Sequence, residues 1–383
     1  MDKIYLKKVI LSYNDICNLL NEFCNNKKYD NRLKKEITTS YTTFKYPLNS
    51  YCIGYGKKHA VIFSNTHGCE IITSLFVLEF ILTLILNDDI YYYISKEFTF
   101  HFIPLLNPEG FIISSSQVYY NLKDLDNNSL QKISKTYLNA YNLDDKIASK
   151  NIKKEKLYKN ILRTSVKLIN NNSMIYSVNN ILKKCNLDSR ILPIWSANGV
   201  GVDPNSNSIH KFCEMKLLRE KWKYSKLRYN DIPVTIPSPM SYPGKKALDP
   251  SCPENIFLYK YITNLYFNLP KSNERLIAIF SYHSTGGEIY SYPDKCISKP
   301  RTILLHNKST DIYSKETGYT PINEDLKYGV MDFYRAYLNN TISLTIELSK
   351  SNGNPIGPFA NLTDLFQEFI NNKKAILKVI TNI

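Results

Sequence analysis

The stretch AVIFSNTHGCEIITSLFVLEFILTLIL, residues 60–86, decides the expected fold. It opens with an apolar run that ends at Ser64, and after a short polar turn it continues from Glu70 to Leu86 as a long apolar segment. The short run is typical of a buried strand, and the long segment is typical of a buried helix. A second apolar run, residues 98–104, follows. Strand, crossover helix and strand predict a βαβ-like unit, in which ligands gather at the strand ends.

The rest of the chain extends this pattern. We expect further strands at residues 277–282, 302–306 and 342–348, and helices at residues 13–27, 253–269, 328–339 and 361–372. Together these elements predict an α/β fold with a mostly buried, mixed sheet. Residues 111–194 stand apart, because they contain no glycine, one proline and repeated Asn and Lys patches. We interpret them as an insertion into the main body of the protein.

Composition limits the class of protein. With 43% hydrophobic and 13% aromatic residues among 383, the chain can fill a substantial core, which excludes a disordered chain. The net charge of +15 would suit a polyanionic partner, but the lysines are spread widely, so we expect no nucleic-acid surface. The most apolar segment carries Glu79 in its middle and is too short to span a bilayer, so we expect no membrane span.

Cysteine usage and the N-terminal residues bear on the compartment. The eight cysteines form no CxxC pair and no regular framework, which is typical of free thiols in a reducing compartment. The first residues, MDKIYLKKVILSYNDI, show neither a long apolar region nor a small-residue cleavage site. We therefore expect a cytoplasmic protein, and the sequence leaves its oligomeric state open.

Three residues have the side chains of a metal site. His67 and Glu70 lie three positions apart where the first strand meets the helix, and His283 ends another apolar strand. Zinc binds imidazole nitrogen and carboxylate oxygen, and a catalytic site supplies three such ligands. The HxxE pair alone is a weak signal, since a core histidine beside a glutamate at a helix N-terminus would look the same. Glu347 is the one carboxylate in a strand that is otherwise apolar or hydroxylic, where a buried charge requires a partner or a function.

Five motifs resemble, in this order, those of the zinc metallocarboxypeptidases related to carboxypeptidase A: THGCE (66–70), LLNPEG (105–110), WSANGVGVDPNSN (195–207), YHSTGGEIY (282–290) and TIEL (345–348). The resemblance implies a mixed eight-stranded sheet flanked by helices on both faces and one zinc per chain. It also implies that His67, Glu70 and His283 bind the metal and that Glu347 is the general acid and base. We accordingly divide the chain into an N-terminal helical extension, 1–50, and a zinc peptidase domain, 51–383, with a Lys/Asn-rich insertion at 111–194.

Two departures from the family concern substrate recognition. Carboxypeptidases carry an arginine after the tryptophan of the third motif and another after its second asparagine, where this chain has Ser196 and Ser206. The first arginine polarises the scissile carbonyl, and the second binds the terminal carboxylate of the substrate. Serine cannot replace a guanidinium that binds a carboxylate through two parallel hydrogen bonds. Ordinary removal of C-terminal residues is therefore not the expected activity.

The chain is more similar to the bacterial γ-D-glutamyl-meso-diaminopimelate peptidases, a branch that lacks the second arginine. Segments similar to those of this branch occur at 241–248, 329–333 and 353–359, with Phe333 in place of the usual tryptophan. The resemblance implies that Tyr328 and Asn205 contact the substrate. A surface tyrosine at a helix start, or an asparagine in a turn, would explain the same two residues without a function.

These features predict a zinc-dependent peptidase that hydrolyses amide bonds of peptidoglycan stem peptides, with the γ-D-glutamyl-diaminopimelate bond as the expected target. Two alternatives stay open. One is a metallocarboxypeptidase that removes C-terminal residues from ordinary peptides, and the other is a protein that binds zinc or wall peptides without cutting them.

Overall fold

The computed structural model describes residues 1–8, 12–29, 32–36, 39–116, 125–147, 171–187, 189–210, 212–214, 216–217, 235–293, 297–322, 329–349 and 361–383, with the backbone alone for 141–147. Its strands form one mixed sheet of eight members in the order β1-β2-β4-β3-β5-β8-β6-β7. Their bounds are β1 (Leu33–Glu36), β2 (Ser50–Gly54), β3 (Lys58–Ser64), β4 (Phe98–Ile103), β5 (Arg275–Ser284), β6 (Glu288–Tyr290), β7 (Thr320–Ile322) and β8 (Ile342–Leu348).

Parallel pairing holds the centre of the sheet together. β3 pairs in parallel with β4 and β5, and β5 pairs in parallel with β8, whereas β1, β2 and β6 join by antiparallel pairing. The crossover from β3 to β4 contains the expected helix, so the βαβ unit predicted from residues 60–104 is confirmed. The carboxyl ends of β3, β5 and β8 meet at one edge, which is where parallel sheets place their ligand sites.

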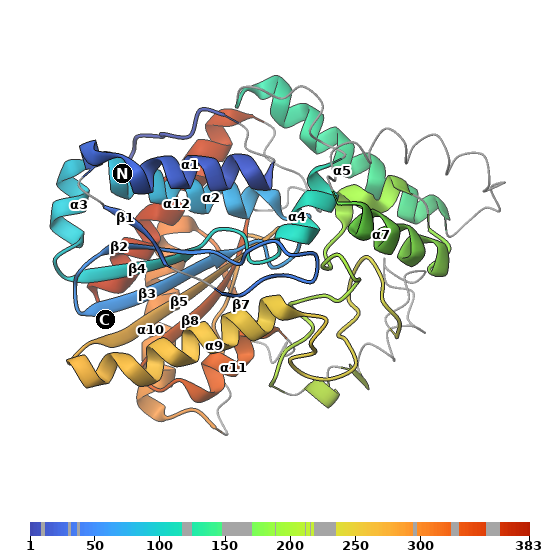
Figure 1. The fold of residues 1–383 in the computed structure, drawn as a ribbon. Helices are drawn as coiled ribbons and strands as arrows, with labels where there is room; N and C mark the ends of the chain where they lie inside the picture. Colours follow the sequence, from blue (N-terminus) through green and yellow to red (C-terminus); the bar gives the residue numbers. More distant parts are fainter. Residues whose placement is uncertain are drawn as a thin grey trace.

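Helices cover both faces of this sheet. The helical segments of the described chain are α1 (Tyr13–Asn25), η1 (Lys27–Tyr29), α2 (Ile71–Leu86), α3 (Asp88–Ile94), α4 (Pro108–Ser115), α5 (Asn127–Ile147), α7 (Asn172–Lys184), η3 (Ser189–Ile194), α9 (Pro253–Asn268), η4 (Leu269–Ser272), α10 (Pro300–Thr317), α11 (Val330–Tyr337) and α12 (Leu362–Thr381). Figure 1 shows α1, α2 and α12 on one face of the sheet and α9 and α11 on the other. The carboxypeptidase-like α/β architecture predicted from the sequence is confirmed.

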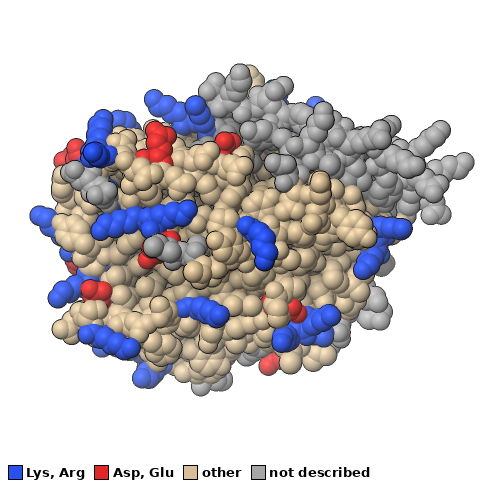
Figure 2. Space-filling view, in the orientation of Figure 1, with Lys and Arg blue, Asp and Glu red and all other residues tan. Residues whose placement is uncertain are grey.

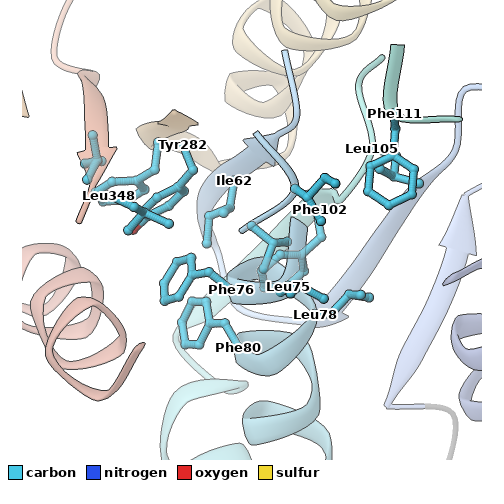
Figure 3. Packing of buried hydrophobic residues seen from close by; sticks show 14 of the residues in the cluster. Ile62, Leu75, Phe76, Leu78, Phe80, Phe102, Leu105, Phe111, Tyr282 and Leu348 are labelled. Atoms are coloured by element: carbon cyan, nitrogen blue, oxygen red, sulfur yellow. The ribbon is translucent and has the colours of Figure 1, made fainter. Parts of the chain in front are cut away.

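The central strand β3 shows why both faces must be covered. Ala60 and Ile62 pack into the core beneath α2 and α12, whereas Val61 and Phe63 pack into the core beneath α9 and α11. A strand that is apolar at every position can be stable only between two layers. In the larger core the ring centroids of Phe76 on α2 and Tyr282 on β5 are 4.6 Å apart. Figure 3 shows both side chains among their neighbours.

One expected strand, 302–306, is wrong, because these residues lie inside α10. Pro300 opens that helix at its first turn, and Gly318 ends it in a left-handed conformation with a φ of 68°. The buried residues of α10 follow the spacing of a single helix face: Thr302, His306, Ser309, Thr310 and Tyr313. A run of four or five apolar residues fits a strand or a buried helix equally well. The spacing of the buried residues over the whole segment, three to four positions apart, is that of a helix.

A buried ion pair joins α2 to α12 and to the N-terminal segment. Lys373 donates hydrogen bonds to Glu79 Oε1 at 2.7 Å, to Thr83 Oγ1 at 2.9 Å and to the Lys3 carbonyl at 3.1 Å. Glu79 Oε2 accepts the backbone N–H groups of Tyr5 and Leu6, at 2.9 and 2.7 Å. Both charged side chains are fully buried. The glutamate in the middle of the apolar helix therefore has a complete set of partners.

Charged side chains of both signs are spread over the visible surface of the protein (Figure 2). On the face seen in Figure 2, Lys and Arg side chains are scattered over many elements, with Asp and Glu side chains between them. Among the described helices, no single one is long and apolar enough to cross a membrane. Of these described helices, only α2 and α3 together have that length and composition, and the chain bends by 91° between them.

The expected N-terminal extension and the expected insertion each contain elements of regular structure. Residues 1–50 contain α1 and also β1, which pairs with β2 at the sheet edge. The segment 111–194 contains α5, α7 and η3 in its described parts, and Figure 1 shows α5 and α7 beyond one end of the sheet. The boundaries at 50, 111 and 194 stay predictions.

Candidate metal centre

The three predicted metal ligands come together at the carboxyl edge of the sheet. His67 and Glu70 lie in the turn between β3 and α2, and His283 lies near the end of the neighbouring strand β5. Glu70 Oε1 is 2.8 Å from His67 Nδ1, and Glu70 Oε2 is 3.1 Å from His283 Nδ1. One donor atom from each residue lies within 4.8 Å of the other two. Two imidazoles and one carboxylate at such separations can share a single metal ion.

The donor set also passes a test of fit for zinc. The contact of Glu70 Oε2 with His283 Nδ1 lacks the geometry of a hydrogen bond, so this oxygen is buried without a hydrogen-bond partner, and so is His283 Nε2. Buried polar atoms without partners are rare, and a metal ion would satisfy the carboxylate oxygen. Two nitrogens and one carboxylate oxygen are also the ligands that a catalytic zinc takes while keeping a position open. His67, Glu70 and His283 therefore suit Zn²⁺.

Glu70 lies close enough to both histidines for their charges to interact directly. Burial alone would raise the pKa of Glu70, but His67 and His283 outweigh it and lower the pKa to about 2. Burial opposes the charged form of His67, yet Glu70 and Asp203 raise its pKa well above the ordinary value. The carboxylates thus stabilise positive charge at this point, which is the requirement for holding a cation.

Close packing of two motifs shapes the ligand turn. A Cβ on Gly68 would lie 2.2 Å from the carbonyl carbon of Gly110, and a Cβ on Gly110 would lie 2.5 Å from the Ala197 carbonyl oxygen. Neither approach is possible for a residue with a side chain. The THGCE, LLNPEG and WSAN motifs therefore depend on one another, because their backbones touch at this turn.

Asp203 is a site residue that sequence reasoning missed. Its Oδ1 lies 3.4 Å from His67 Nε2, on the opposite side of the imidazole from Glu70. A carboxylate at the second nitrogen fixes the orientation and tautomer of a metal-binding histidine. The aspartate stands within the VDPNSN part of the third motif, so the signal was present in the sequence.

The serine in place of the second arginine has a different role. Ser206 is fully buried, and its hydroxyl donates to Asp203 Oδ2 at 2.6 Å. Its backbone N–H also approaches Asp203 Oδ1, at 3.3 Å. The side chain therefore helps to hold the carboxylate that orients His67. The other serine, Ser196, lies with its hydroxyl 3.4 Å from Cys69 Sγ, next to the ligand turn.

Glu347 stands beside the metal ligands. In the parallel register of β5 and β8 it pairs with His283, so the two residues are neighbours at the same edge. Burial, together with the carboxylates of Glu70 and Glu288, raises the pKa of Glu347 to about 7. A carboxyl group with a pKa near neutrality can both accept and donate a proton at physiological pH.

Of the two predicted substrate contacts, Asn205 and Tyr328, the structure describes only Asn205. Asn205 Oδ1 accepts the backbone N–H of Val330 at 3.1 Å, which ties the third motif to the start of α11. A Cβ on Gly329 would lie 2.9 Å from the same oxygen. Tyr328 lies outside the described residues, and so does the segment 353–359.

A second carboxylate shares the strand face with Glu347. Glu288 of β6 is the direct cross-strand partner of Glu347, and Tyr290 is the partner of Thr345. The Tyr290 hydroxyl donates to Glu288 Oε2 at 2.5 Å. A Cβ on Gly286 would lie 3.1 Å from Glu347 Cβ and 3.2 Å from Glu288 Oε2, so both side chains border the space above this glycine. Two carboxylates in facing cross-strand positions repel each other when both are charged, so this pair is not explained by stability.

Comparison with known proteins agrees with this site. The profile of the zinc carboxypeptidase family matches residues 36–381. Similar solved structures include thrombin-activatable fibrinolysis inhibitor (14% identity, TM-score 0.55, 100% of this chain and 76% of the other) and carboxypeptidase A from Helicoverpa armigera (12%, 0.56, 99% and 73%). A metallo-carboxypeptidase from Burkholderia cenocepacia is also similar (11%, 0.52, 97% and 70%). Among curated proteins no significant match was found. With the family profile spanning most of the sequence and the ligand set in place, the chain belongs to the zinc carboxypeptidase family and is a zinc metallopeptidase.

Proposed function

We propose that this metallopeptidase hydrolyses the γ-D-glutamyl-diaminopimelate bond of peptidoglycan stem peptides. The observation that carries the proposal is the replacement of the carboxylate-binding arginine by Ser206, whose hydroxyl is buried against Asp203. A site without that guanidinium gains little from the free α-carboxylate of an ordinary peptide. Recognition must then come from other groups that flank the scissile bond.

The charges around Glu347 favour a substrate with a protonated amine. Glu288 adds a carboxylate on the same strand face, next to the hydroxyl of Tyr290. The nearby Arg335 does not offset it, because its guanidinium donates to Asp332 Oδ1 at 2.5 Å and to the Ser343 carbonyl at 3.0 Å. Diaminopimelate and lysine carry a second amine that such a carboxylate could bind through a charge-assisted hydrogen bond.

Each residue of the site has a proposed role in this reaction. His67, Glu70 and His283 would hold Zn²⁺, which when bound supplies a Lewis acid for the scissile carbonyl. Asp203 would orient His67 through its Nε2. Glu347, the neighbour of His283 in the strand register, would accept the proton of the attacking water and deliver it to the departing amine nitrogen. Asn205 and Tyr328 would position the substrate.

The test is a direct comparison of substrates. Zinc-loaded protein is incubated with a γ-D-glutamyl-diaminopimelyl tripeptide, its lysine analogue, and blocked dipeptides ending in Phe, Leu, Lys or Arg, with mass spectrometry of the products. We expect cleavage of the γ-D-glutamyl bond and little release of C-terminal residues from the dipeptides. Faster hydrolysis of a dipeptide would overturn the proposal and leave a metallocarboxypeptidase of ordinary specificity.

A variant tests the charge argument separately. In a γ-D-glutamyl peptide whose diamino acid is replaced by norleucine, the amine is lost while the chain length is kept. We expect the unmodified protein to prefer the lysine analogue, and Glu288→Gln to lose that preference by about tenfold or more, the usual scale for a hydrogen bond to a charged group. Equal preference in both proteins would show that Glu288 does not read the amine.

A further inference from the structure

Helix α5, in the middle of the insertion 111–194, reaches the metal-binding turn. The hydroxyl of Tyr137 donates a hydrogen bond of 2.8 Å to the backbone carbonyl of Cys69, the residue directly before the ligand Glu70. Tyr137 is only 2% exposed. We propose that Tyr137 is a positioning residue for the metal centre, and that the insertion is thereby part of the zinc site.

The turn that carries the ligands has a partner for each of its carbonyls. Asn107 Nδ2 donates to the Thr66 carbonyl at 3.2 Å, and Asn65 Nδ2 donates to the carbonyls of His67 and Gly68 at 3.1 and 3.3 Å. Asn65 directly follows β3, and Asn107 caps the start of α4. The last carbonyl, that of Cys69, depends on the insertion. A buried carbonyl without a partner is costly, so this bond constrains the turn.

The position of that carbonyl explains how Tyr137 acts on a ligand. The peptide group between Cys69 and Glu70 is planar, so its carbonyl and the Glu70 N–H rotate together. The Glu70 N–H in turn donates to the His67 carbonyl at 3.1 Å and closes the turn. Fixing the carbonyl therefore fixes the direction in which Glu70 leaves the turn, and with it the distance from the carboxylate to both histidines.

Helix α5 is held firmly enough to act as this support. Its buried residues form a stripe at helical spacing, with Leu130, Ile133, Tyr137 and Ala140 all nearly inaccessible to solvent. The Tyr137 hydroxyl also lies 3.2 Å from Ser114 Oγ, which donates to the Pro193 carbonyl at 2.6 Å. Burial raises the pKa of Tyr137 well above its ordinary value, so the phenol keeps the proton that it donates.

Tyr137→Phe removes the hydroxyl and keeps the ring. Partners in the outer shell of a metal site are typically worth about 10–100-fold in metal affinity. We expect the zinc dissociation constant, measured by competition with a chromophoric chelator, to rise by about tenfold or more. The visible spectrum of the cobalt-substituted protein should change as well, because a reoriented Glu70 alters the ligand field.

Tyr13→Phe is the matched control. The Tyr13 hydroxyl also donates to a backbone carbonyl, that of Pro47 at 3.0 Å, and the residue is also buried. Both variants should lose some resistance to urea, but only Tyr137→Phe should lose zinc affinity. Equal zinc affinity in the two variants would overturn the proposal, whatever their stability.

A second variant covers the case in which Tyr137→Phe does not fold. Ser114→Ala removes the bond to the Pro193 carbonyl and the contact with the Tyr137 hydroxyl, but leaves Tyr137 in place. It should raise the zinc dissociation constant measurably, by a smaller factor than the loss of the phenol. Unchanged affinity in folded Ser114→Ala would count against a role of the insertion. These measurements involve no substrate, so they do not depend on the proposed peptidase specificity.

Discussion

Replacing Lys373 by methionine should destabilise the protein severely. The substitution keeps the length and the apolar stem of the side chain but removes the ammonium group that contacts Glu79, Thr83 and the Lys3 carbonyl. Glu79 would keep its bonds from the Thr83 hydroxyl and from the two backbone N–H groups of Tyr5 and Leu6. Its negative charge, however, would stay fully buried without a counterion.

The magnitude follows from that uncompensated charge. Removing one partner of a buried ion pair costs about 3–5 kcal/mol, whereas replacing both partners can be nearly neutral. Native domains are stable by only about 5–15 kcal/mol, so Lys373→Met should remove a large part of the free energy of unfolding. The double variant Glu79→Gln, Lys373→Met should recover a substantial part of it, because no charge is then buried.

Urea denaturation followed by circular dichroism gives the four free energies of the double-mutant cycle. Lys378→Met is a matched control on the same helix, because its pair with Glu316 is exposed and surface pairs contribute about 0–1 kcal/mol. A loss for Lys373→Met as small as that of the control would refute the view that the buried pair joins the N-terminal segment to α2 and α12.

The remaining predictions concern the metal, the proton transfer and pH. His67→Ala and His283→Ala should each lose most of the single zinc found by metal analysis, and stoichiometric zinc in both would contradict the ligand set. Glu347→Gln should keep zinc but lose turnover by about 10²–10⁴-fold, since an amide cannot accept the proton; a loss within tenfold would exclude this role. His59 of β3 is buried, with its Nδ1 2.8 Å from Nε2 of His101 on β4. Burial and His101 lower the pKa of His59 to about 4, against about 6.5 in the unfolded chain, so the unfolded state binds more protons between these values. Urea midpoints of the unmodified protein should therefore fall more steeply from pH 7 to 4.5 than those of His59→Gln, and parallel curves would be evidence against it.

The sequence predicted the central strands and the ligand set because their signals are local. An apolar strand followed by a polar turn and a long apolar helix, as at residues 60–86, has few other solutions. His283 and Glu347 likewise stand near the ends of strands whose other residues are mostly apolar or hydroxylic. The structure brings these residues together because parallel strands present their carboxyl ends at one edge.

What the sequence did not predict depends on contacts between distant segments. β6 and β7 contain three residues each, too few for a periodic pattern to show. They exist because β6 pairs with the edge of β8 and β7 in turn pairs with β6. The role of Asp203 becomes visible only when the third motif lies against His67. Tyr137 is one of 30 tyrosines, and nothing in its neighbourhood along the chain indicates that α5 meets the ligand turn.

The strand order also has a consequence for biosynthesis. β3 is flanked by β4, its early neighbour, and by β5, which is made only after the insertion and the third motif. A growing chain therefore presents His67 and Glu70 long before His283 exists. Since chains are made from the N-terminus and distant strand pairing is slow, the third ligand arrives late and Glu347 arrives later still. A ribosome-bound fragment that ends before β5 offers only two of the three ligands of this site, His67 and Glu70. Firm retention of zinc at the site would therefore report that synthesis has passed His283.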